Sequence, residues 1–342
     1  MTEYVLNPIG KENVFMSNRF MQPLRIAVQW GFLLYIILIG IRFYRFVQYC
    51  RGESMLFVPR PDGVEGFLPI SALVSLRGWL QTGEINPVHP AGLVIFLTII
   101  GVALILTRSF CSWLCPVGTV SELCWKLGFN LFRRNVRPPQ WLDIGLRGLK
   151  YLFLLFFIWS IFVLMSPESV TAFISSDYNK SADIRMLDFF LHPSSFSLVV
   201  IGVLILISFP VKNAFCRFLC PYGALLGLVS LISPVKVTRD RALCVSCGVC
   251  SQACPSHLPV MSQERIHSPE CIGCWRCIAH CRAHGALSMR VTGLRSSVPG
   301  LLFALLVVLV FWGGTRIGKM TGYWHTGIPL GEHIRLSRKT QR

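Results

Sequence analysis

Eight cysteines between residues 244 and 281 fall into two runs with the same spacing. Each run has the pattern Cys-x2-Cys-x2-Cys-x3-Cys, the first from Cys244 and the second from Cys271. In such a run three closely spaced thiolates bind three irons of one cubane, and the fourth cysteine binds the other cluster. The spacing therefore predicts two [4Fe-4S] clusters. The predicted metal ligands are Cys244, Cys247, Cys250 and Cys281 in cluster 1, and Cys271, Cys274, Cys277 and Cys254 in cluster 2.

Zinc is the main alternative for these thiolates. Zinc sites usually consist of paired Cys-x2-Cys knuckles, which the present spacing does not form, so the pattern favours iron–sulfur clusters. We expect Gly248 and Gly273 to lie where the chain turns tightly around a cluster, because glycine adopts backbone angles that other residues avoid. His280 and His284 lie on either side of Cys281 and are expected to tune a cluster through hydrogen bonds rather than to bind it.

A second cysteine pattern, Cys-x3-Cys-Pro, occurs twice, as Cys111 with Cys115 and as Cys216 with Cys220. A spacing of four places both sulfurs of a pair on one face of a helix. Three interpretations compete: a third metal or cluster site held by all four cysteines, two redox-active dithiols, or buried structural cysteines. The duplication argues against inert packing, because a small buried hydrophobic residue need not be cysteine at four equivalent places.

Long apolar stretches must position these cysteines. Hydrophobic residues make up 53% of the 342 residues and charged residues 14%, with a mean hydropathy of +0.56, which is typical of a protein embedded in a bilayer. A membrane-spanning helix needs about 17 to 25 predominantly apolar residues. Five stretches of about that length are predicted to span the membrane, at residues 26–46, 91–107, 151–167, 194–211 and 297–315.

The chain also contains an internal repeat. Residues 61–67 resemble 167–173, residues 89–90 match 192–193, and residues 110–118 match 215–223, in the same order and at offsets of 103 to 106. Each unit is expected to comprise a helix, an outer loop and a second helix that ends in Cys-x3-Cys-Pro. Because an even number of spans separates equivalent points, the two repeats should be parallel and related by an axis along the membrane normal.

These patterns predict an all-α transmembrane bundle of about five helices, in two parallel repeats, with a small α+β bacterial two-cluster ferredoxin domain. The predicted domains are a first transmembrane repeat at residues 1–130, a second at 131–235, the ferredoxin domain at 236–292, and a fifth transmembrane helix and tail at 293–342. The first 25 residues are polar and show no cleavable signal pattern. We therefore expect the cysteine clusters to lie in a reducing compartment.

The net charge of +17 is distributed between the apolar stretches rather than on one patch. Residues 212–295 contain 10 Lys or Arg and 3 Asp or Glu, whereas residues 47–90 contain 3 Lys or Arg and 4 Asp or Glu. Cytoplasmic loops collect Lys and Arg, so the ferredoxin domain and both Cys-x3-Cys-Pro motifs should face the cytoplasm of a prokaryotic inner membrane. The expected surroundings are membrane lipid, and nucleic-acid binding is disfavoured. A fifth span would place the tail outside.

Two His-Pro pairs, at His89 and His192, occupy equivalent places in the repeats, with Glu84 and Asp188 a few residues before them. An ionisable group next to a membrane span is a functional candidate. These histidines are therefore candidate catalytic residues that would accept protons from quinol oxidation. A haem bound by both histidines is an alternative. The simplest explanation is that each pair starts a helix, since proline suits the first helical turn.

Together, the four cysteine motifs resemble those of the membrane polyferredoxins of the NapH, NosR and CcoG type. Those proteins are similar to the present chain in having paired helices that end in Cys-x3-Cys-Pro on the cytoplasmic side, followed by a two-cluster ferredoxin domain. The resemblance covers roughly residues 20–295. The chain departs from the shortest members by its fifth apolar stretch and tail, and no segment resembles the large periplasmic flavin-binding domain of the NosR branch.

The resemblance implies an electron-transfer subunit of an oxidoreductase complex, with quinol dehydrogenation as one candidate activity. Electrons would pass between the quinone pool or a membrane partner and a redox partner protein, such as a cytochrome, a ferredoxin or a reductase subunit. The two [4Fe-4S] clusters would carry them. An alternative of a different class is an iron–sulfur redox sensor, or an assembly or metal-reduction factor for a respiratory enzyme.

Overall fold

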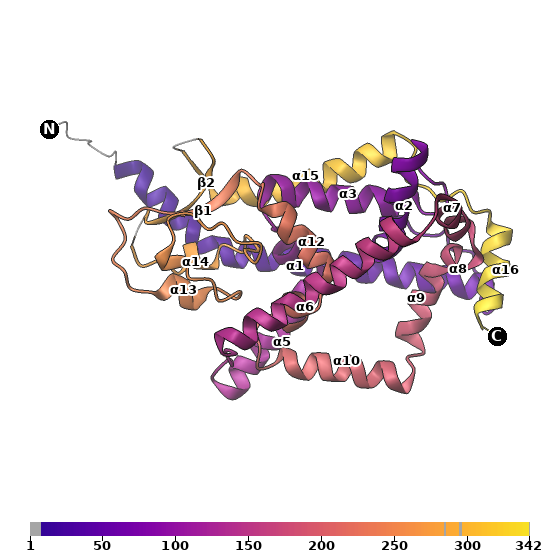
Figure 1. The fold of residues 1–342 in the computed structure, drawn as a ribbon, viewed down its shortest axis with the longest axis horizontal. Coiled ribbons are helices and arrows are strands. Elements are labelled where there is room, and N and C mark those ends of the chain that lie inside the picture. Colours follow the sequence, from indigo (N-terminus) through magenta and orange to yellow (C-terminus); the bar gives the residue numbers. More distant parts are fainter. Residues whose placement is uncertain (1–7, 284, 294–295, 342) are drawn as a thin grey trace. The chain divides into compact units, whose positions relative to one another are not determined.

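The structure is a computed structural model that describes residues 8–283, 285–293 and 296–341. Most of these residues are helical (Figure 1). The helices are α1 (Pro8–Arg51), α2 (Pro69–Thr82), α3 (Pro90–Leu106), α4 (Phe110–Trp113), α5 (Pro116–Phe132), α6 (Gln140–Trp159), α7 (Pro167–Ser175), α8 (Asp177–Lys180), α9 (Ala182–Leu191), α10 (Ser195–Ser208), α11 (Ala214–Phe218), α12 (Pro221–Ser230), α13 (Val249–Ala253), α14 (Arg276–Ala279), α15 (Gly300–Met320) and α16 (Leu330–Gln341). The short helical segments are η1 (Val64–Phe67), η2 (Ser160–Leu164) and η3 (Val260–Ser262), and the strands are β1 (Val235–Arg239), β2 (Leu287–Val291) and β3 (Ser297–Val298).

Three helical segments of the described chain are long and apolar enough to cross a bilayer, namely Phe20–Arg51, Gln140–Leu164 and Gly300–Met320. Helices α9 and α10 would form a fourth if counted together, although they meet at a bend of 76°. Helix α3 is apolar but has 17 residues. A helix therefore lies in each of the five predicted stretches, whereas the predicted count of five membrane spans is not confirmed.

The bend between α9 and α10 has a local cause. His192 ends α9 with non-helical backbone angles (φ −125°, ψ 60°), and Pro193 follows it. Proline disfavours the helical conformation of the residue before it and cannot donate a backbone hydrogen bond. The second His-Pro pair therefore separates two helices, and α10 begins two residues after Pro193.

Contacts divide the chain into two compact units, and the first draws on Met1–Leu33, Ile100–Pro139 and Ser208–Val310. Its sheet has the order β1-β2-β3 and is antiparallel, with Val235 opposite Val291 and Val237 opposite Met289. Val235, Val237, Leu287 and Met289 are buried, as the two-residue period of a strand with one covered face requires. Because both cysteine runs lie between β1 and β2 in sequence, this pairing ties together the two ends of the cysteine-bearing segment.

The second unit draws on Leu34–Ile99, Gln140–Ile207 and Phe311–Arg342. Helix α2 packs against α7, and α16 packs against α9. Apolar residues fill two core clusters here, one around Phe46 and Ile184 and the other around Val74 and Ile174. Helix α16 lies in the C-terminal tail, for which the sequence analysis predicted no helix.

Candidate metal centre

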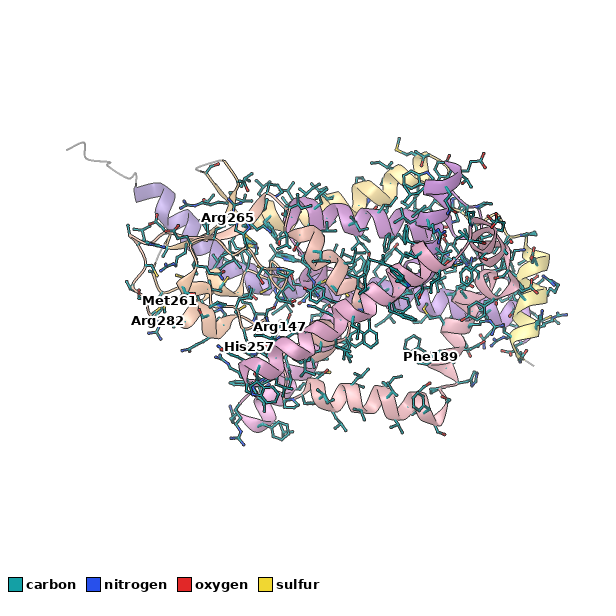
Figure 2. All side chains as sticks on the ribbon, in the orientation of Figure 1. Arg147, Phe189, His257, Met261, Arg265 and Arg282 are labelled. Atoms are coloured by element: carbon teal, nitrogen blue, oxygen red, sulfur yellow. The ribbon has the colours of Figure 1, made fainter. Side chains whose placement is uncertain are left out.

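Two hollows in the first unit are lined by the cysteines of the two runs, four in each hollow. The cysteines of one hollow are Cys244, Cys247, Cys250 and Cys281, and those of the other are Cys254, Cys271, Cys274 and Cys277. The hollows thus group the cysteines into the same two sets that the spacing predicts. Met261, which is labelled in Figure 2, adds an apolar wall to the first hollow. The ligand assignment stays a prediction, which this grouping supports.

The donors in these hollows fit iron–sulfur clusters. All of the cysteines are free thiols, and no disulfide joins any of them. Within the described ranges, no three His, Cys, Asp or Glu side chains converge closely enough to bind a single metal ion. A mononuclear zinc site needs such convergence, whereas the thiolates around a cubane each bind a different iron. Four thiols in one hollow are a donor set that a cubane can use.

Both cysteine runs turn at the same two places. The residue before the second cysteine has a positive φ in each run, 52° at Ser246 and 57° at Gly273, and so has the residue after it, 73° at Gly248 and 60° at Trp275. The prediction of tight turns at Gly248 and Gly273 is confirmed. Ser246 and Trp275 adopt the same left-handed conformation without being glycine, at a cost of about 1 to 3 kcal/mol each. The two runs thus share the same loop geometry, although different residues occupy the equivalent positions.

Burial keeps several of the thiols protonated in the metal-free chain. It raises the pKa of Cys254 to about 12 and that of Cys271 to about 11, and repulsion from neighbouring cysteines adds to the effect at Cys254. Because iron binds the thiolate, cluster assembly must release these protons. His280 is exposed, with its Nδ1 2.8 Å from the carbonyl oxygen of Arg276. His284 lies outside the described residues.

The two cysteines of each Cys-x3-Cys-Pro motif do not share one continuous helix, so the prediction from their spacing is wrong. Cys111 lies in α4, but Cys115 has extended backbone angles (φ −67°, ψ 120°) and caps α5. Likewise, Cys216 lies in α11, whereas Cys220 (φ −73°, ψ 106°) caps α12. The proline after the second cysteine is the cause, because it pushes the residue before it out of the helical region.

The fold nevertheless brings the four cysteines of the two motifs together. Burial, with repulsion from Cys111 and Cys220, raises the pKa of Cys115 to about 12. Burial and the other three sulfurs raise the pKa of Cys216 well above its ordinary value. The structure therefore places the four sulfurs in one buried environment, and the three interpretations of these cysteines stay open.

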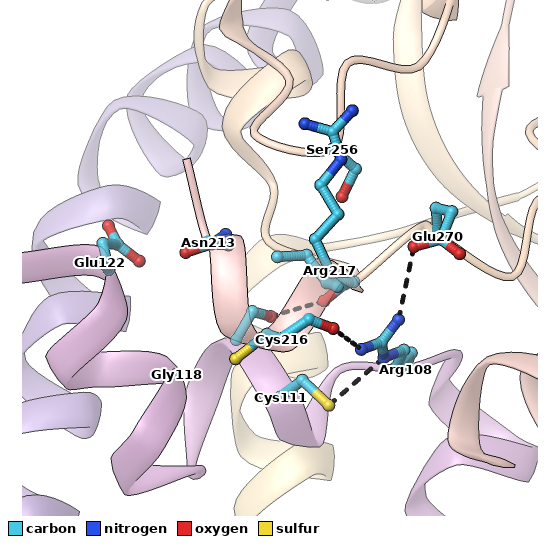
Figure 3. Close-up of a pocket in the computed structure, with 11 residues that line it drawn as sticks. Arg108, Cys111, Gly118, Glu122, Asn213, Cys216, Arg217, Ser256 and Glu270 are labelled. Atoms are coloured by element: carbon cyan, nitrogen blue, oxygen red, sulfur yellow. Dashed lines mark hydrogen bonds and ion pairs between the residues drawn. The ribbon is translucent and has the colours of Figure 1, made fainter. Parts of the chain in front are cut away.

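Arg108, which the sequence analysis missed, lies beside these cysteines. Its buried guanidinium donates from Nε to the Cys111 sulfur (3.4 Å) and from Nη2 to the carbonyl oxygen of Cys216 (3.3 Å). Nη1 lies 3.8 Å from a carboxylate oxygen of Glu270. Figure 3 shows Arg108 between the two cysteine-bearing helices and Glu270. A single cation thus connects both motifs to the ferredoxin segment.

The helix that carries Cys111 is also hydrogen-bonded to the loop of the second cysteine run. The Ser112 hydroxyl donates to the carbonyl oxygen of Ile272 (2.5 Å), and the Trp113 indole N–H donates to that of Gly273 (3.1 Å). Trp113 is fully buried. These bonds hold the Cys271–Cys274 loop against α4, so the predicted cluster 2 site lies next to the first Cys-x3-Cys-Pro motif.

A buried ion pair fixes α1 to α5 in the same unit. Arg25 is fully buried and donates to both carboxylate oxygens of Glu122, from Nη1 at 2.8 Å and from Nη2 at 2.7 Å. It also donates to the carbonyl oxygen of Ser112 at 3.0 Å. Burial alone would raise the pKa of Glu122, but Arg25 holds it below its ordinary value. No spacing rule links residues 97 positions apart, so this pair could not be predicted from the sequence.

The two candidate histidines of the second unit have different surroundings. His89 is buried, with Nε2 2.7 Å from the carbonyl oxygen of Asn179 and Nδ1 3.6 Å from Glu65. Its carboxylate neighbour is therefore Glu65 rather than Glu84. Burial alone would lower the pKa of His89, but Glu65 holds it above its ordinary value. His192 is exposed, and the structure does not bring it to His89.

Two protein-family models match the chain at these cysteines. A model described as a 4Fe-4S binding domain matches residues 88–139 and, separately, residues 191–239. A model described as a 4Fe-4S dicluster domain matches residues 236–282. The first model thus covers each Cys-x3-Cys-Pro motif once, as the internal repeat predicts, and the second covers both cysteine runs.

Several curated proteins are similar to the chain. The "Putative electron transport protein YccM" of Escherichia coli (strain K12) is 40% identical over 318 residues, which cover 91% of this chain and 89% of the relative. Ferredoxin-type protein NapH of the same organism is 24% identical over 51% of this chain and 59% of the relative. Methylamine utilization ferredoxin-type protein MauN of Paracoccus denitrificans is 29% identical over 47% and 53%. No solved structure matches.

Proposed function

Because the chain belongs to the family of NapH-like 4Fe-4S membrane proteins, we propose that it passes electrons between the quinone pool or another membrane partner and a redox partner protein. Its iron–sulfur electron-transfer character follows from the family. The observation that carries the finer proposal is the grouping of eight free cysteines into two hollows of four. Two [4Fe-4S] clusters, each a one-electron carrier when bound, would occupy these hollows.

The two hollows suit different exchange partners. Among the cysteines of the first hollow, Cys247 is exposed, whereas three cysteines of the second hollow are buried. The second hollow also adjoins α4 through Ser112 and Trp113. We therefore assign the first hollow to exchange with a partner protein in water, and the second to exchange with the membrane part of the chain.

We assign the four cysteines of the Cys-x3-Cys-Pro motifs to a further metal or cluster site. The match of a 4Fe-4S binding domain to each repeat and the mutual electrostatic effect of the four sulfurs support this assignment. Replacing all four with serine should lower the iron content, whereas Cys124→Ser, outside any motif, should not. Iron in excess of roughly the eight atoms of two cubanes would establish a third site. If the four-serine variant contains as much iron and as much sulfide as the unchanged protein, these thiols are not ligands.

We place the ferredoxin segment and the Cys-x3-Cys-Pro motifs on the cytoplasmic side of an inner membrane. The excess of Lys and Arg in residues 108–150 and 212–295 supports this orientation. Introducing a cysteine at Asn130 and labelling it in intact cells with a membrane-impermeant thiol reagent tests the orientation. Labelling that needs no permeabilisation would place the end of α5 outside and contradict the proposal.

Quinone is the proposed membrane donor or acceptor, and His89 is the candidate that would handle its protons. The burial of His89 beside Glu65 supports a role that His192, exposed, does not share. Adding a quinol to the purified protein should bleach the cluster absorbance. His89→Ala should slow that bleaching, and His192→Ala should not. Full quinol-linked electron transfer in both variants would remove the histidines from the proposal.

The basic experiment is iron and sulfide analysis with electron paramagnetic resonance on protein purified without oxygen. We expect iron and acid-labile sulfide in equal amounts, and reduced-cluster signals from two interacting centres. Colourless protein that contains zinc and accepts no electrons would refute the proposed function.

A further inference from the structure

A wide recess in the first unit has no role in the proposed function. It is lined by residues of α5, of the loops after α5 and α10, and of the ferredoxin helices α13 and α14. Its cavity volume is about 380 Å³. Small-molecule sites in proteins commonly have volumes of about 300 to 1,000 Å³. The recess is therefore large enough for a ligand of cofactor size.

The recess is strongly positive. Lys126, Lys212 and Arg276 line it, and none of the three is fully exposed. Among the described residues, the carboxylate paired with two of them is that of Glu122, which lies 2.7 Å from Lys126 and 3.9 Å from Arg276. Glu122 is already bound through both oxygens by Arg25. The single negative charge is thus shared among three cations, and Lys212 adds a fourth.

Lys212 has no carboxylate partner among the described residues. Its ammonium lies over the ring of Trp125, 5.4 Å from the centroid, and the Arg276 guanidinium lies 4.7 Å from the same ring. Burial and repulsion from Arg276 lower the pKa of Lys212. A bound anion would relieve this repulsion, because an opposite charge nearby favours the charged form of an amine.

The wall of the recess belongs to the cysteine runs themselves. Ala253, Arg276 and His280 line the recess, and each directly precedes a predicted cluster ligand in sequence. Those ligands are Cys254, Cys277 and Cys281. Two of them belong to the predicted cluster 2 and one to cluster 1. A ligand in the recess would thus lie beside the backbone that holds both clusters.

We propose that this recess binds a phosphate group carried by a ligand. Phosphate accepts several charge-assisted hydrogen bonds at once, which suits converging Lys and Arg side chains better than a single carboxylate would. The rest of such a ligand would meet an apolar contact at Phe129, which is half exposed at the rim. The Asn130 side chain would give it a polar contact. Two sources carry this chemistry, a soluble phosphorylated redox cofactor and the headgroup of an anionic phospholipid.

Flavin mononucleotide and riboflavin form a matched pair of probes, because they differ by the phosphate alone. We expect the full-length protein in detergent to quench flavin mononucleotide fluorescence with a Kd at least tenfold below that for riboflavin. Lys212→Gln should weaken binding about tenfold, and so should Asn130→Asp, which adds a negative charge at an exposed position. Arg134→Gln, which removes an exposed charge outside the recess lining, is the control and should leave the Kd unchanged.

A second arm separates the two sources. Short-chain phosphatidylglycerol is added as a competitor, with phosphatidylcholine as the neutral control, and its binding is measured on the same variants. Lys212-dependent binding of the nucleotide, resistant to phosphatidylglycerol, identifies a soluble cofactor. Lys212-dependent binding of phosphatidylglycerol in its place identifies a lipid headgroup. Equal affinity for both flavins with no effect of Lys212→Gln on either probe overturns the inference. Because binding needs no electron transfer, this result is separate from the test of the proposed function.

Discussion

Arg25→Met is the sharpest test of how the first unit is held together. The substitution removes both hydrogen bonds to Glu122 and the bond to the Ser112 carbonyl oxygen. It leaves a carboxylate without its main partner in a buried place, while methionine keeps most of the apolar volume of the side chain. The helix that carries Arg25 would keep a weaker polar contact with α4 and α5, because the Gln29 side-chain amide also donates to the Ser112 carbonyl oxygen (2.9 Å) and to Glu122 (3.3 Å).

The expected cost follows from the contacts that remain. Removing one partner of a buried ion pair costs about 3 to 5 kcal/mol. Lys126 still lies 2.7 Å from Glu122, so we expect the lower end, about 3 kcal/mol, or a factor of about 150 in the unfolding equilibrium. Because the pKa of Glu122 is depressed in the fold, the pair stabilises the protein above the unfolded pKa of the carboxyl. The loss should therefore be constant near neutral pH.

Denaturant unfolding in detergent, followed by tryptophan fluorescence, measures this cost. The matched control is Arg241→Met, whose partner Glu264 lies 2.6 Å away in a pair with side chains 70% and 59% exposed. That variant should lose no more than about 1 kcal/mol. Glu122→Gln and the double variant complete a cycle, in which a coupling of about 2 kcal/mol is expected. If Arg25→Met costs no more than Arg241→Met, the argument from burial is wrong.

Two further predictions concern the cysteine sites. Gly118→Ala would press a methyl group against the carbonyl oxygen of Cys111, whereas a methyl group at Gly101 meets no neighbour; we expect G118A to lose about 2 kcal/mol of unfolding free energy and iron, and G101A to lose neither. Cluster reconstitution should be more complete at about pH 8.5 than at about pH 6.5, because burial raises the pKa of Cys254 and Cys271 and iron must displace their protons. An iron yield independent of pH would contradict this second reasoning.

Spacing predicted the parts of the site that are local in the chain. The left-handed turns at Gly248 and Gly273 were predictable because glycine marks such turns. Those at Ser246 and Trp275 were not, since there the surrounding loop imposes the conformation on residues that disfavour it. The proline after Cys115 could have predicted the helix break there. We predicted one continuous helix instead, because the two cysteines have helical spacing.

Contacts between residues far apart in the chain could not be predicted from the sequence. Glu84 is near His89 in the chain, yet Glu65 is near it in space, because η1 and the start of α3 meet in the second unit. Arg108 and Glu270 are 162 positions apart and still form one ion pair. Hydropathy located helices at all five apolar stretches, but it could not show that α9 and α10 meet at a sharp bend.

Two hydrogen bonds, from Ser112 and Trp113 to the Ile272 and Gly273 carbonyl oxygens, bear on the rate of electron transfer within the chain. A small soluble ferredoxin must diffuse to its partner and collide in the right orientation. Here hydrogen bonds hold the loop against the helix that carries Cys111. The distance that an electron would cross between the two cysteine sites is therefore set when the chain folds. Under the proposed function, diffusion would then limit only the exchange at the first hollow, where Cys247 is exposed.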